Sequence, residues 1–309
     1  MDWPPESFLA KFRRWRRALK ARMPYVRRRN YSVLVKREQQ FIDDMLLHSS
    51  HSNSAAITAV KAWDASQTTD EVCLFVTHAS QPVLKEHVTA HLRLLIEANI
   101  AVVLILNTDL GPNDFAIPPS LITQLRGVYV RENLGFDFAA WSHLWKIADG
   151  FPGCKRLYLA NDSVVGPLDD EPYRQIIRRI RESPADVVGL TEAPQPRPHL
   201  QSYFLVVQGK ALRSSLFTNF FNGLLCLPTK DMVIATYETR MTGYLRAAGL
   251  RCEALFAGPI PGGHTENDLR HRWAELIGCG FPFIKTSVLA LHRDDPRVLS
   301  LLPERFRSS

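Results

Sequence analysis

The residues best suited to chemistry include Asp162, which lies between Asn161 and Ser163 directly after the apolar run 157–160. An acidic residue at the carboxyl end of a parallel strand is where an α/β sheet usually presents its functional groups. A carboxylate there can bind a divalent ion, and the ion neutralises a phosphate leaving group. The alternative is a strand that simply ends in a turn, because Asn, Asp and Ser are also turn-forming residues.

Two further polar groups follow apolar runs that the sequence predicts as strands. Thr77 and His78 end the first run, and Asn133, Gly135 and Asp137 follow the third. Glycine permits a tight turn or close approach of a ligand, and amide and carboxylate groups bind ribose or base hydroxyls. Since parallel strands present their carboxyl ends at one edge, we expect these groups to converge on one crevice. The alternative is that the groups at Thr77 and Asp137 only cap the helices that follow.

The elements that position these groups alternate along the chain. Apolar runs predict strands at 72–77, 101–106, 128–130, 157–160 and 186–190, and helical spacing predicts helices at 83–98, 138–148 and 172–182. The second of these strands is almost continuously β-branched and Leu, as expected of a strand buried on both faces. This alternation predicts an α/β fold, with a mostly parallel sheet flanked by helices.

The composition, with 46% apolar and 22% charged residues among 309, is typical of a soluble globular enzyme. No apolar run reaches the ~18 residues of a membrane span, and the first forty residues lack the apolar core of a signal peptide. The five cysteines are dispersed, which argues against a disulfide framework or a zinc site and favours a reducing cytoplasm. The lack of a Gly-x-Gly-x-x-Gly or Walker motif weighs against a classical dinucleotide-binding fold and a P-loop kinase.

The N-terminal segment differs from the rest of the chain in charge. Twelve Lys and Arg residues and no acidic residue lie between Lys11 and Arg37, whereas the remainder has 26 basic against 31 acidic residues. Residues 3–23 are predicted as an amphipathic helix with a basic face opposite an apolar stripe. The stripe consists of Phe8, Phe12, Trp15 and Leu19. We expect residues 3–37 to bind an anionic membrane surface, which predicts a peripheral protein at the inner face of the cell membrane.

Three alternatives stand beside this membrane role: docking on the protein's own main domain, binding of nucleic acid, and a transit peptide. Because the basic character is confined to the N-terminal segment, we predict no nucleic acid partner for the protein as a whole. A second helix is predicted at 33–47 and a loop or linker at 48–54. The predicted organisation is therefore a basic segment at 1–54 and a main domain at 55–309.

Several motifs follow one another in order between about residue 72 and residue 291. They are Glu132-Asn133-x-Gly135-x-Asp137, Asn161-Asp162-Ser163-x-x-Gly166-Pro167, His199-Leu200-Gln201-Ser202-Tyr203-Phe204, the pair Tyr237-Glu238, and Trp273 ahead of Phe281-Pro282-Phe283-Ile284-Lys285. In this combination the sequence resembles the rhamnan synthesis protein F family of bacterial polysaccharide glycosyltransferases. Several linked motifs in order are far more specific than any one of them. The basic N-terminal helix lies outside the resemblance.

The resemblance implies a GT-A-like nucleotide-sugar fold for residues 55–309, with Asn161, Asp162 and Ser163 in place of the Asp-x-Asp signature. It implies that Asp162 acts in catalysis by holding Mg²⁺ or Mn²⁺ against the donor diphosphate. Asn161 offers only a neutral oxygen where the signature has a second carboxylate, so a basic residue is the alternative source of positive charge. Donor binding falls to the groups at the strand ends. They are Thr77, His78, Asn133, Gly135, Asp137, Asn161 and Ser163.

Glu238 is the expected general base. An inverting transfer needs one base that deprotonates the acceptor hydroxyl. The resemblance implies this role for Glu238, because its predicted helix follows the acceptor-side motif in the order of inverting GT-A enzymes. The alternative is a solvated helix carboxylate near Arg240.

The sugar or acceptor pocket is expected to include His199, Gln201 and Tyr203, since alternate positions of a strand share a face. Trp273 is expected to offer its ring to the apolar face of a sugar, and its alternative is core packing. Lys285 is expected to reach phosphate, and its alternative is a solvated side chain at a strand end.

The resemblance implies an inverting rhamnosyltransferase that moves rhamnose from dTDP-rhamnose to a lipid-linked surface polysaccharide, such as an O-antigen, a capsule or a rhamnan. One alternative is a non-catalytic binding or scaffold subunit of a polysaccharide assembly complex. The other is a metal-dependent nucleotidyltransferase, which also uses a strand-end carboxylate. That reaction calls for a second acidic metal ligand and a basic phosphate loop, and the sequence shows neither.

Overall fold

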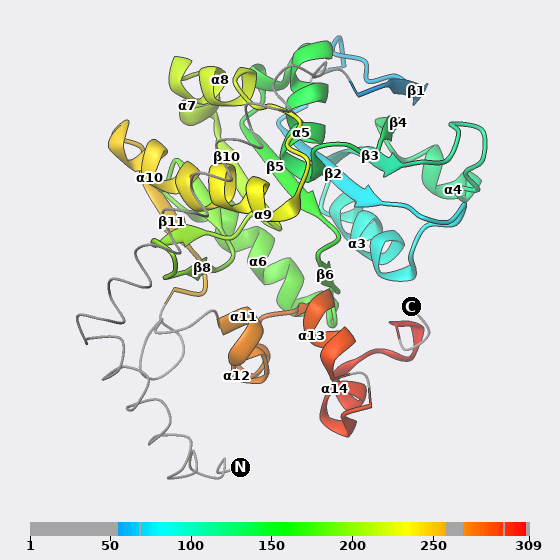
Figure 1. Cartoon of the computed structure of the whole chain (residues 1–309), viewed down its shortest axis with the longest axis vertical. Helices are drawn as coiled ribbons and strands as arrows, with labels where there is room; N and C mark the ends of the chain where they lie inside the picture. The colour runs from blue at the N-terminus through cyan, green and yellow to red at the C-terminus, as the bar shows by residue number, and fades with distance from the viewer. Residues whose placement is uncertain (1–54, 68, 258–267, 293, 307–309) are drawn as a thin grey trace, which may run out of the picture. The chain divides into compact units, whose positions relative to one another are not determined.

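The computed structural model describes residues 55–67, 69–257, 268–292 and 294–306 (Figure 1). The predicted amphipathic helix at 3–23, the second helix at 33–47 and the linker at 48–54 lie outside these residues. The predicted domain boundary falls at the edge of the described part and stays a prediction. No helix among the described residues is long and apolar enough to cross a membrane.

An eight-stranded sheet forms the centre of the described part (Figure 1). In their order across the sheet the strands are β1 (Ile57–Lys61), β4 (Gly127–Glu132), β3 (Ala101–Thr108), β2 (Glu71–His78), β5 (Arg156–Asn161), β10 (Phe204–Gln208), β7 (Val187–Gly189) and β11 (Cys252–Ala254). β1 and β10 are antiparallel to their neighbours, and the other strands all run in one direction. The sheet is therefore mostly parallel, and the predicted α/β class is confirmed.

Helices cover both faces of this sheet. α3 (Glu86–Glu97) and α6 (Asp170–Glu182) share one buried apolar cluster with alternate residues of β2, β3 and β5. α5 (Phe136–Ile147) contacts β2 and β3 outside that cluster, and α8 (Ser215–Asn222) packs against α5. Alternate residues of a strand point to opposite faces. The central strands are therefore buried on both sides, as their continuous apolar sequences predict.

α6 illustrates how the local sequence fixes an element. Its buried residues Tyr173, Ile176, Ile177 and Ile180 recur at helical spacing, and charged residues occupy the solvent face. Asp169 caps the helix by accepting a hydrogen bond of 3.0 Å from a backbone N–H of the first turn. The spacing of the apolar residues and the capping Asp169 both indicate a helix at this place, so the sequence predicts α6 well.

The strand order reverses between β2 and β5, and such a reversal indicates where a site can form. From β2 the chain moves to β3 and β4 on one side, and β5 then pairs with β2 on its other side. In open α/β sheets, a crevice opens at the carboxyl ends of the two strands where the order reverses. Here those strands are β2, which ends at His78, and β5, which ends at Asn161.

Shorter elements complete the described part. Two small sheets pair β12 (Ile284–Lys285) with β6 (Val164–Val165) and β8 (Glu192–Ala193) with β9 (His199–Leu200). The remaining helices and helical turns are α4 (Pro119–Ile122), η1 (Phe151–Gly153), α7 (Gly209–Leu212), α9 (Lys230–Val233), η2 (Ile234–Glu238), α10 (Thr239–Ala247), α11 (Asp268–His271), α12 (Trp273–Gly278), α13 (Thr286–Leu291), α14 (Pro296–Leu301) and η3 (Glu304–Phe306).

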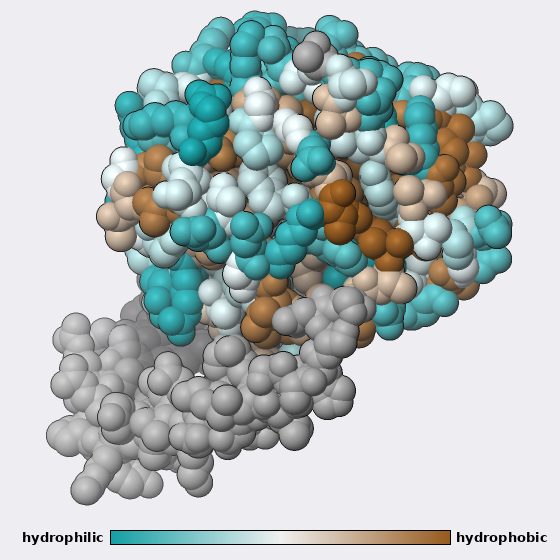
Figure 2. Space-filling model, turned by 90° about the horizontal axis from the view of Figure 1, so that it is seen from above, coloured by the Kyte–Doolittle hydropathy of each residue, from teal (hydrophilic) through white to brown (hydrophobic). Residues whose placement is uncertain are grey.

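The strands and helices predicted between residues 72 and 190 all have counterparts in the structure, with ends displaced by a few residues. The helix predicted at 83–98, for example, begins at Glu86. The antiparallel strands β1 and β10 were not predicted. Pairing between segments far apart in sequence leaves little trace in local periodicity. On the face shown in Figure 2, hydrophilic residues surround small apolar groups, as on the surface of a folded domain.

Candidate active site

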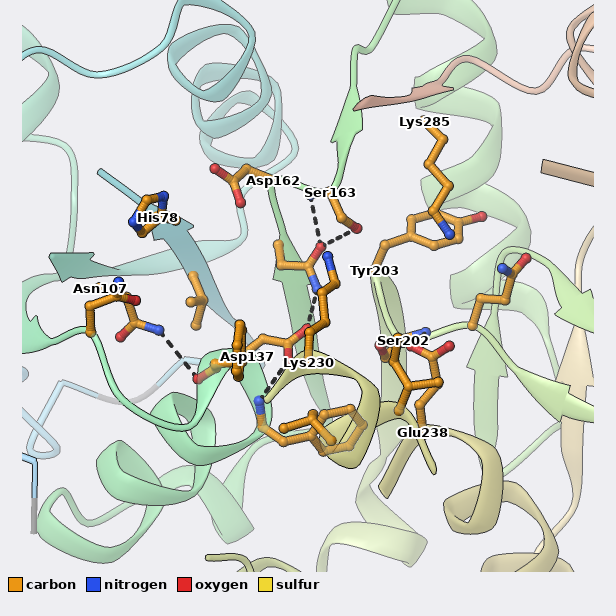
Figure 3. Close-up of a pocket in the computed structure, with 18 residues that line it drawn as sticks. His78, Asn107, Asp137, Asp162, Ser163, Ser202, Tyr203, Lys230, Glu238 and Lys285 are labelled. Atoms are coloured by element: carbon orange, nitrogen blue, oxygen red, sulfur yellow. Dashed lines mark hydrogen bonds between the residues drawn. The ribbon is translucent and has the colours of Figure 1, made fainter. Parts of the chain in front are cut away.

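A pocket of about 480 Å³ opens at the crevice between β2 and β5 (Figure 3). Many of the residues predicted for the site line it, namely His78, Asn133, Asp137, Asn161, Asp162, Ser163, Gln201, Tyr203, Glu238 and Lys285. They come from strand ends and helices that are far apart in the sequence. The fold thus brings together most of the groups that the sequence singles out.

Asn161 links the two sides of the pocket floor. Its amide Nδ2 donates to Asp137 Oδ2 at 2.6 Å, and its Oδ1 accepts from the Ser163 hydroxyl at 2.7 Å and the Ser163 N–H at 3.0 Å (Figure 3). Asp137 also accepts from the Phe138 N–H at 3.0 Å. Burial, with a further contribution from the Glu238 carboxylate, raises the pKa of Asp137 to about 6.

Asp162 lies at the pocket rim with two partners. The Thr77 hydroxyl donates to its Oδ2 at 2.7 Å, and the Lys85 ammonium forms an ion pair with the same oxygen at 2.6 Å. Thr77 is buried and does not line the pocket, so it holds Asp162 in place instead of meeting a ligand. His78, the next residue, does line the pocket.

The described residues around Asp162 do not fit the predicted divalent ion. Lys85 neutralises the one carboxylate of the Asn-Asp-Ser turn, whereas hard cations are bound where negatively charged oxygens are in excess. Asn161 already uses its amide oxygen to accept from Ser163. Among the described residues, no group of three or more His, Cys, Asp or Glu side chains is arranged to hold a metal.

Gly135 determines how α5 enters the pocket. It caps the helix with a φ of +70°, and Phe136 follows with a φ of +59°. A side chain at Gly135 would place its Cβ 2.6 Å from the Ala139 Cβ and 2.7 Å from the Cys226 Cα. Only glycine allows both this left-handed φ and the close approach of Ala139 and Cys226. The resulting turn directs the first turn of α5, with Asp137, towards the pocket. Gly135 therefore shapes the site without lining it.

A buried arginine fixes the loop ahead of Gly135. Arg131 is 0% exposed and donates to the carbonyl of Leu134 at 2.6 Å and to Asn107 Oδ1 at 3.2 Å. Asn107 in turn donates to the carbonyl of Phe136 at 3.2 Å and lines the pocket. These bonds hold the loop that carries Asn133 over the crevice.

Glu238 reaches the pocket from a π-helical turn, η2, between α9 and α10. Its Oε2 accepts from the Ser202 hydroxyl and from the Ser202 N–H, the latter at 3.4 Å, and its Oε1 lies 3.6 Å from His199 Nε2. Burial raises the pKa of Glu238, but the contacts with His199 and Ser202 outweigh it and leave the pKa below 4.5. The carboxylate is therefore ionised at neutral pH.

His199, Gln201 and Tyr203 do not share the face of one strand, and this prediction is corrected. β9 ends at Leu200, and the chain then turns before β10. Gln201 and Tyr203 still line the pocket, but His199 is buried behind Glu238 and its Nδ1 lies 2.7 Å from the Arg197 carbonyl oxygen. The histidine supports the carboxylate and does not line the cavity.

Trp273 and Lys285 were both predicted to line the pocket, and only Lys285 does so. Trp273 packs at the start of α12 in a buried cluster with Ile284 and Val288 and does not line the pocket, so its core-packing alternative holds. Lys285 lines the pocket because β12 pairs it with Val164, just beyond the end of β5. The small sheet of β6 and β12 thus brings a C-terminal lysine to the strand-end group.

The site also includes four residues that the sequence did not predict, namely Lys85, Asn107, Ser202 and Lys230. Asn107 lies near the end of β3, so its position at a strand end could have identified it. Ser202 lies between two residues that were singled out, but it lies in a turn and not on a strand face. Lys85 and Lys230 each precede or begin a helix, and no local pattern links either of them to the sheet edge.

Comparison with known proteins shows the family to which this chain is similar. The profile described as rhamnan synthesis protein F matches residues 102–302, which is more than half of the chain. The virulence protein VirA of Vibrio anguillarum is 26% identical over an alignment that covers 54% of this chain and 62% of VirA. This chain also has a weak structural likeness to the catalytic domain of Drosophila β1,4-galactosyltransferase 7 in complex with xylobiose, with a TM-score of 0.34 and 12% identity. That likeness covers 64% of this chain and 72% of the other.

Proposed function

Since this chain belongs to the rhamnan synthesis protein F family, we propose that it is a glycosyltransferase that uses a nucleotide-sugar donor and a glycan acceptor. The observation that carries this proposal is the pocket at the β2–β5 crevice, where an ionised carboxylate, Glu238, faces polar groups from several strand ends. A single base and a set of hydrogen-bonding groups are what an inverting transfer of a sugar requires.

In the proposed reaction, the acceptor hydroxyl attacks the anomeric carbon of the donor sugar. The new bond joins the acceptor oxygen to that carbon, and the bond between the carbon and the diphosphate oxygen breaks. Its electron pair leaves with the nucleoside diphosphate, and the hydroxyl proton passes to Glu238. Ser202 holds the Glu238 carboxylate in position through two hydrogen bonds. Asp137 instead holds Asn161 and the first turn of α5 through hydrogen bonds to its two oxygens.

The donor side of the pocket is formed by the strand-end groups, among them His78, Asn133 and Ser163. Their ring nitrogens, amide and hydroxyl suit the hydroxyls of a ribose and a sugar. The donor that we propose is dTDP-rhamnose. Support comes from Val76, Val233 and other apolar residues that line the same pocket, since a 6-deoxy sugar presents a methyl group to be buried.

We further propose that the acceptor is a lipid-linked surface polysaccharide and that the protein works at the inner face of the cell membrane. The description of the family and the basic, apolar-striped sequence at 3–37 support this part of the proposal. The reaction would then extend a glycan at the surface to which the N-terminal segment binds.

A donor panel tests the proposal. Purified full-length protein is incubated with dTDP-rhamnose, dTDP-glucose, UDP-glucose and GDP-mannose, and release of nucleoside diphosphate is measured. We expect dTDP-rhamnose to be favoured over dTDP-glucose by about 100-fold or more, because the two sugars differ in the configuration of ring carbons as well as in the 6-hydroxyl, so that several polar contacts are lost. A preference for another donor would overturn the rhamnosyl assignment alone. Binding of donors without release would instead favour a non-catalytic binding subunit.

A further inference from the structure

Two lysine side chains reach into the pocket from different parts of the fold (Figure 3). Lys230 begins α9, and Lys285 ends β12. Within the described residues, neither ammonium group has a hydrogen bond or an ion pair. Positive charge without such a partner therefore faces the cavity in which we place the donor.

The electrostatics of this pair point to an anion. Burial lowers the pKa of Lys285, the Glu238 carboxylate opposes that effect, and the charge of Lys230 adds to it. The charge of Lys230 therefore disfavours the ammonium form of Lys285, although by less than the Glu238 carboxylate favours it. Like charges in a partly buried site are costly unless an ion of opposite charge lies between them. An anion with several negatively charged oxygens accepts hydrogen bonds from both groups at once.

The Lys85–Asp162 ion pair removes a negative charge that would otherwise repel such an anion. The Lys85 ammonium lies 2.6 Å from Asp162 Oδ2 and is 41% exposed, while Asp162 is 14% exposed. Because this ion pair has no net charge, Asp162 does not repel a phosphate at the rim of the pocket. It also has no excess negative charge with which to attract a divalent cation.

We propose that Lys230 and Lys285 bind the diphosphate of the nucleotide sugar directly, so that the donor is bound and its leaving group stabilised without a divalent metal. This inference rests on the proposed glycosyltransferase function and assigns the diphosphate site within it. As the sugar–oxygen bond breaks, negative charge grows on the leaving diphosphate. The two ammonium groups stabilise that charge, which in many transferases is the task of a metal ion.

The test is calorimetric titration of the full-length protein with dTDP and with UDP, in EDTA and in MgCl₂. We expect binding in EDTA, with a Kd within about twofold of the value in MgCl₂. Lys230→Gln and Lys285→Gln should each weaken binding by about 10- to 100-fold, because a hydrogen bond to a charged group contributes about 1.5–3 kcal/mol. Lys285→Met is made alongside, since it keeps the apolar stem and removes only the charge.

Lys155→Gln is the matched control. Lys155 precedes β5 at the end of the strand opposite to the pocket, and its side chain is 68% exposed. Its loss should leave dTDP binding unchanged. Thermal unfolding of each variant checks that the fold is intact, and inorganic pyrophosphate is titrated to separate the diphosphate from the nucleoside.

The outcomes separate this inference from the proposed function. Nucleotide binding that appears only with MgCl₂ overturns the metal-independent site and leaves the glycosyltransferase proposal standing. Folded lysine variants that bind dTDP as tightly as the wild type also overturn the inference alone. A protein that binds neither nucleotide in either buffer contradicts both proposals.

Discussion

Three carboxylates share one pocket, and their partners give them different properties. Glu238 is held by Ser202 and keeps a pKa below 4.5, whereas burial raises the pKa of Asp137 to about 6. Asp162 is neutralised by Lys85. Environments that differ in this way separate the roles of chemically identical groups. Glu238 is ionised at neutral pH and lines the pocket beside Ser202, and for this reason we propose it as the base.

The sequence singled out these three carboxylates because each lies near a strand end or within a motif of the resemblance. It did not predict their partners. Lys85 is 77 residues from Asp162, and Ser202 is 36 residues from Glu238. Contacts at such separations depend on strand order and helix placement, which a single sequence does not specify.

Glu238→Gln should lower the rate of sugar transfer by about 10²- to 10⁴-fold, because the amide cannot take the acceptor proton. Affinity for dTDP should change little, since the base acts on the acceptor. Glu97→Gln is the control, as Glu97 is exposed at the end of α3. Calorimetry beside a transfer assay checks this expectation, and equal losses in binding and in rate would make Glu238 structural.

The raised pKa of Asp137 predicts a pH dependence of stability. Between 3.8, its ordinary pKa, and about 6, the folded state holds the proton more tightly than the unfolded state. The ionised Asp137 side chain therefore destabilises the folded state above pH 6. This destabilisation disappears as the pH falls from 6 towards 4 and the side chain takes up a proton. The free energy of unfolding of the wild type should gain, relative to Asp137→Asn, on the order of 3 kcal/mol over that range.

Denaturant unfolding of both proteins at pH 4 to 8 measures this difference. Carboxyl groups far from Asp137 contribute equally to both curves, so the difference between the curves reports on Asp137 and on the Glu238 carboxylate that interacts with it. A difference that does not vary with pH would show that Asp137 has an ordinary pKa.

At the scale of elements, the parts that the sequence predicted best are those with strong local patterns. α6 has helical spacing and a capping Asp169, and β3 has a continuous apolar run. The parts that it missed depend on distant partners. β10 is a strand because it pairs with β5 and β7. The π-helical turn that ends at Glu238 contains neither Gly nor Pro, so its sequence does not signal the interruption. π-helical turns of this kind are frequently found at functional sites.

Gly135→Ala should destabilise the protein by about 1–3 kcal/mol and weaken nucleotide binding, because the left-handed φ and the contact with Cys226 both exclude a side chain. Gly243→Ala is the matched control, since Gly243 lies inside α10 with open space around it. It should be stabilising by about 0.5–1 kcal/mol. Thermal unfolding with and without dTDP compares the two, and equal effects would contradict the role of Gly135 as the turn into the site.

At the scale of the whole molecule, the sequence divides the chain into a basic segment and a mildly acidic remainder. The apolar stripe of the predicted helix supplies insertion into a membrane, and its basic residues supply attraction worth about 1 kcal/mol each near an anionic surface. We therefore expect the full chain to sediment with anionic vesicles at low salt and less so at high salt. A chain lacking residues 1–30 should stay in solution, and equal sedimentation of the two would contradict the membrane role.

We propose that the pocket at the β2–β5 crevice transfers sugar from a nucleotide donor. The most direct test of this proposal is the release of dTDP from dTDP-rhamnose by the purified full chain, with and without a lipid-linked glycan acceptor. We expect that the acceptor accelerates release by the wild type and that Glu238→Gln loses this release while it still binds dTDP. Acceptor-dependent release that survives unchanged in Glu238→Gln would contradict it.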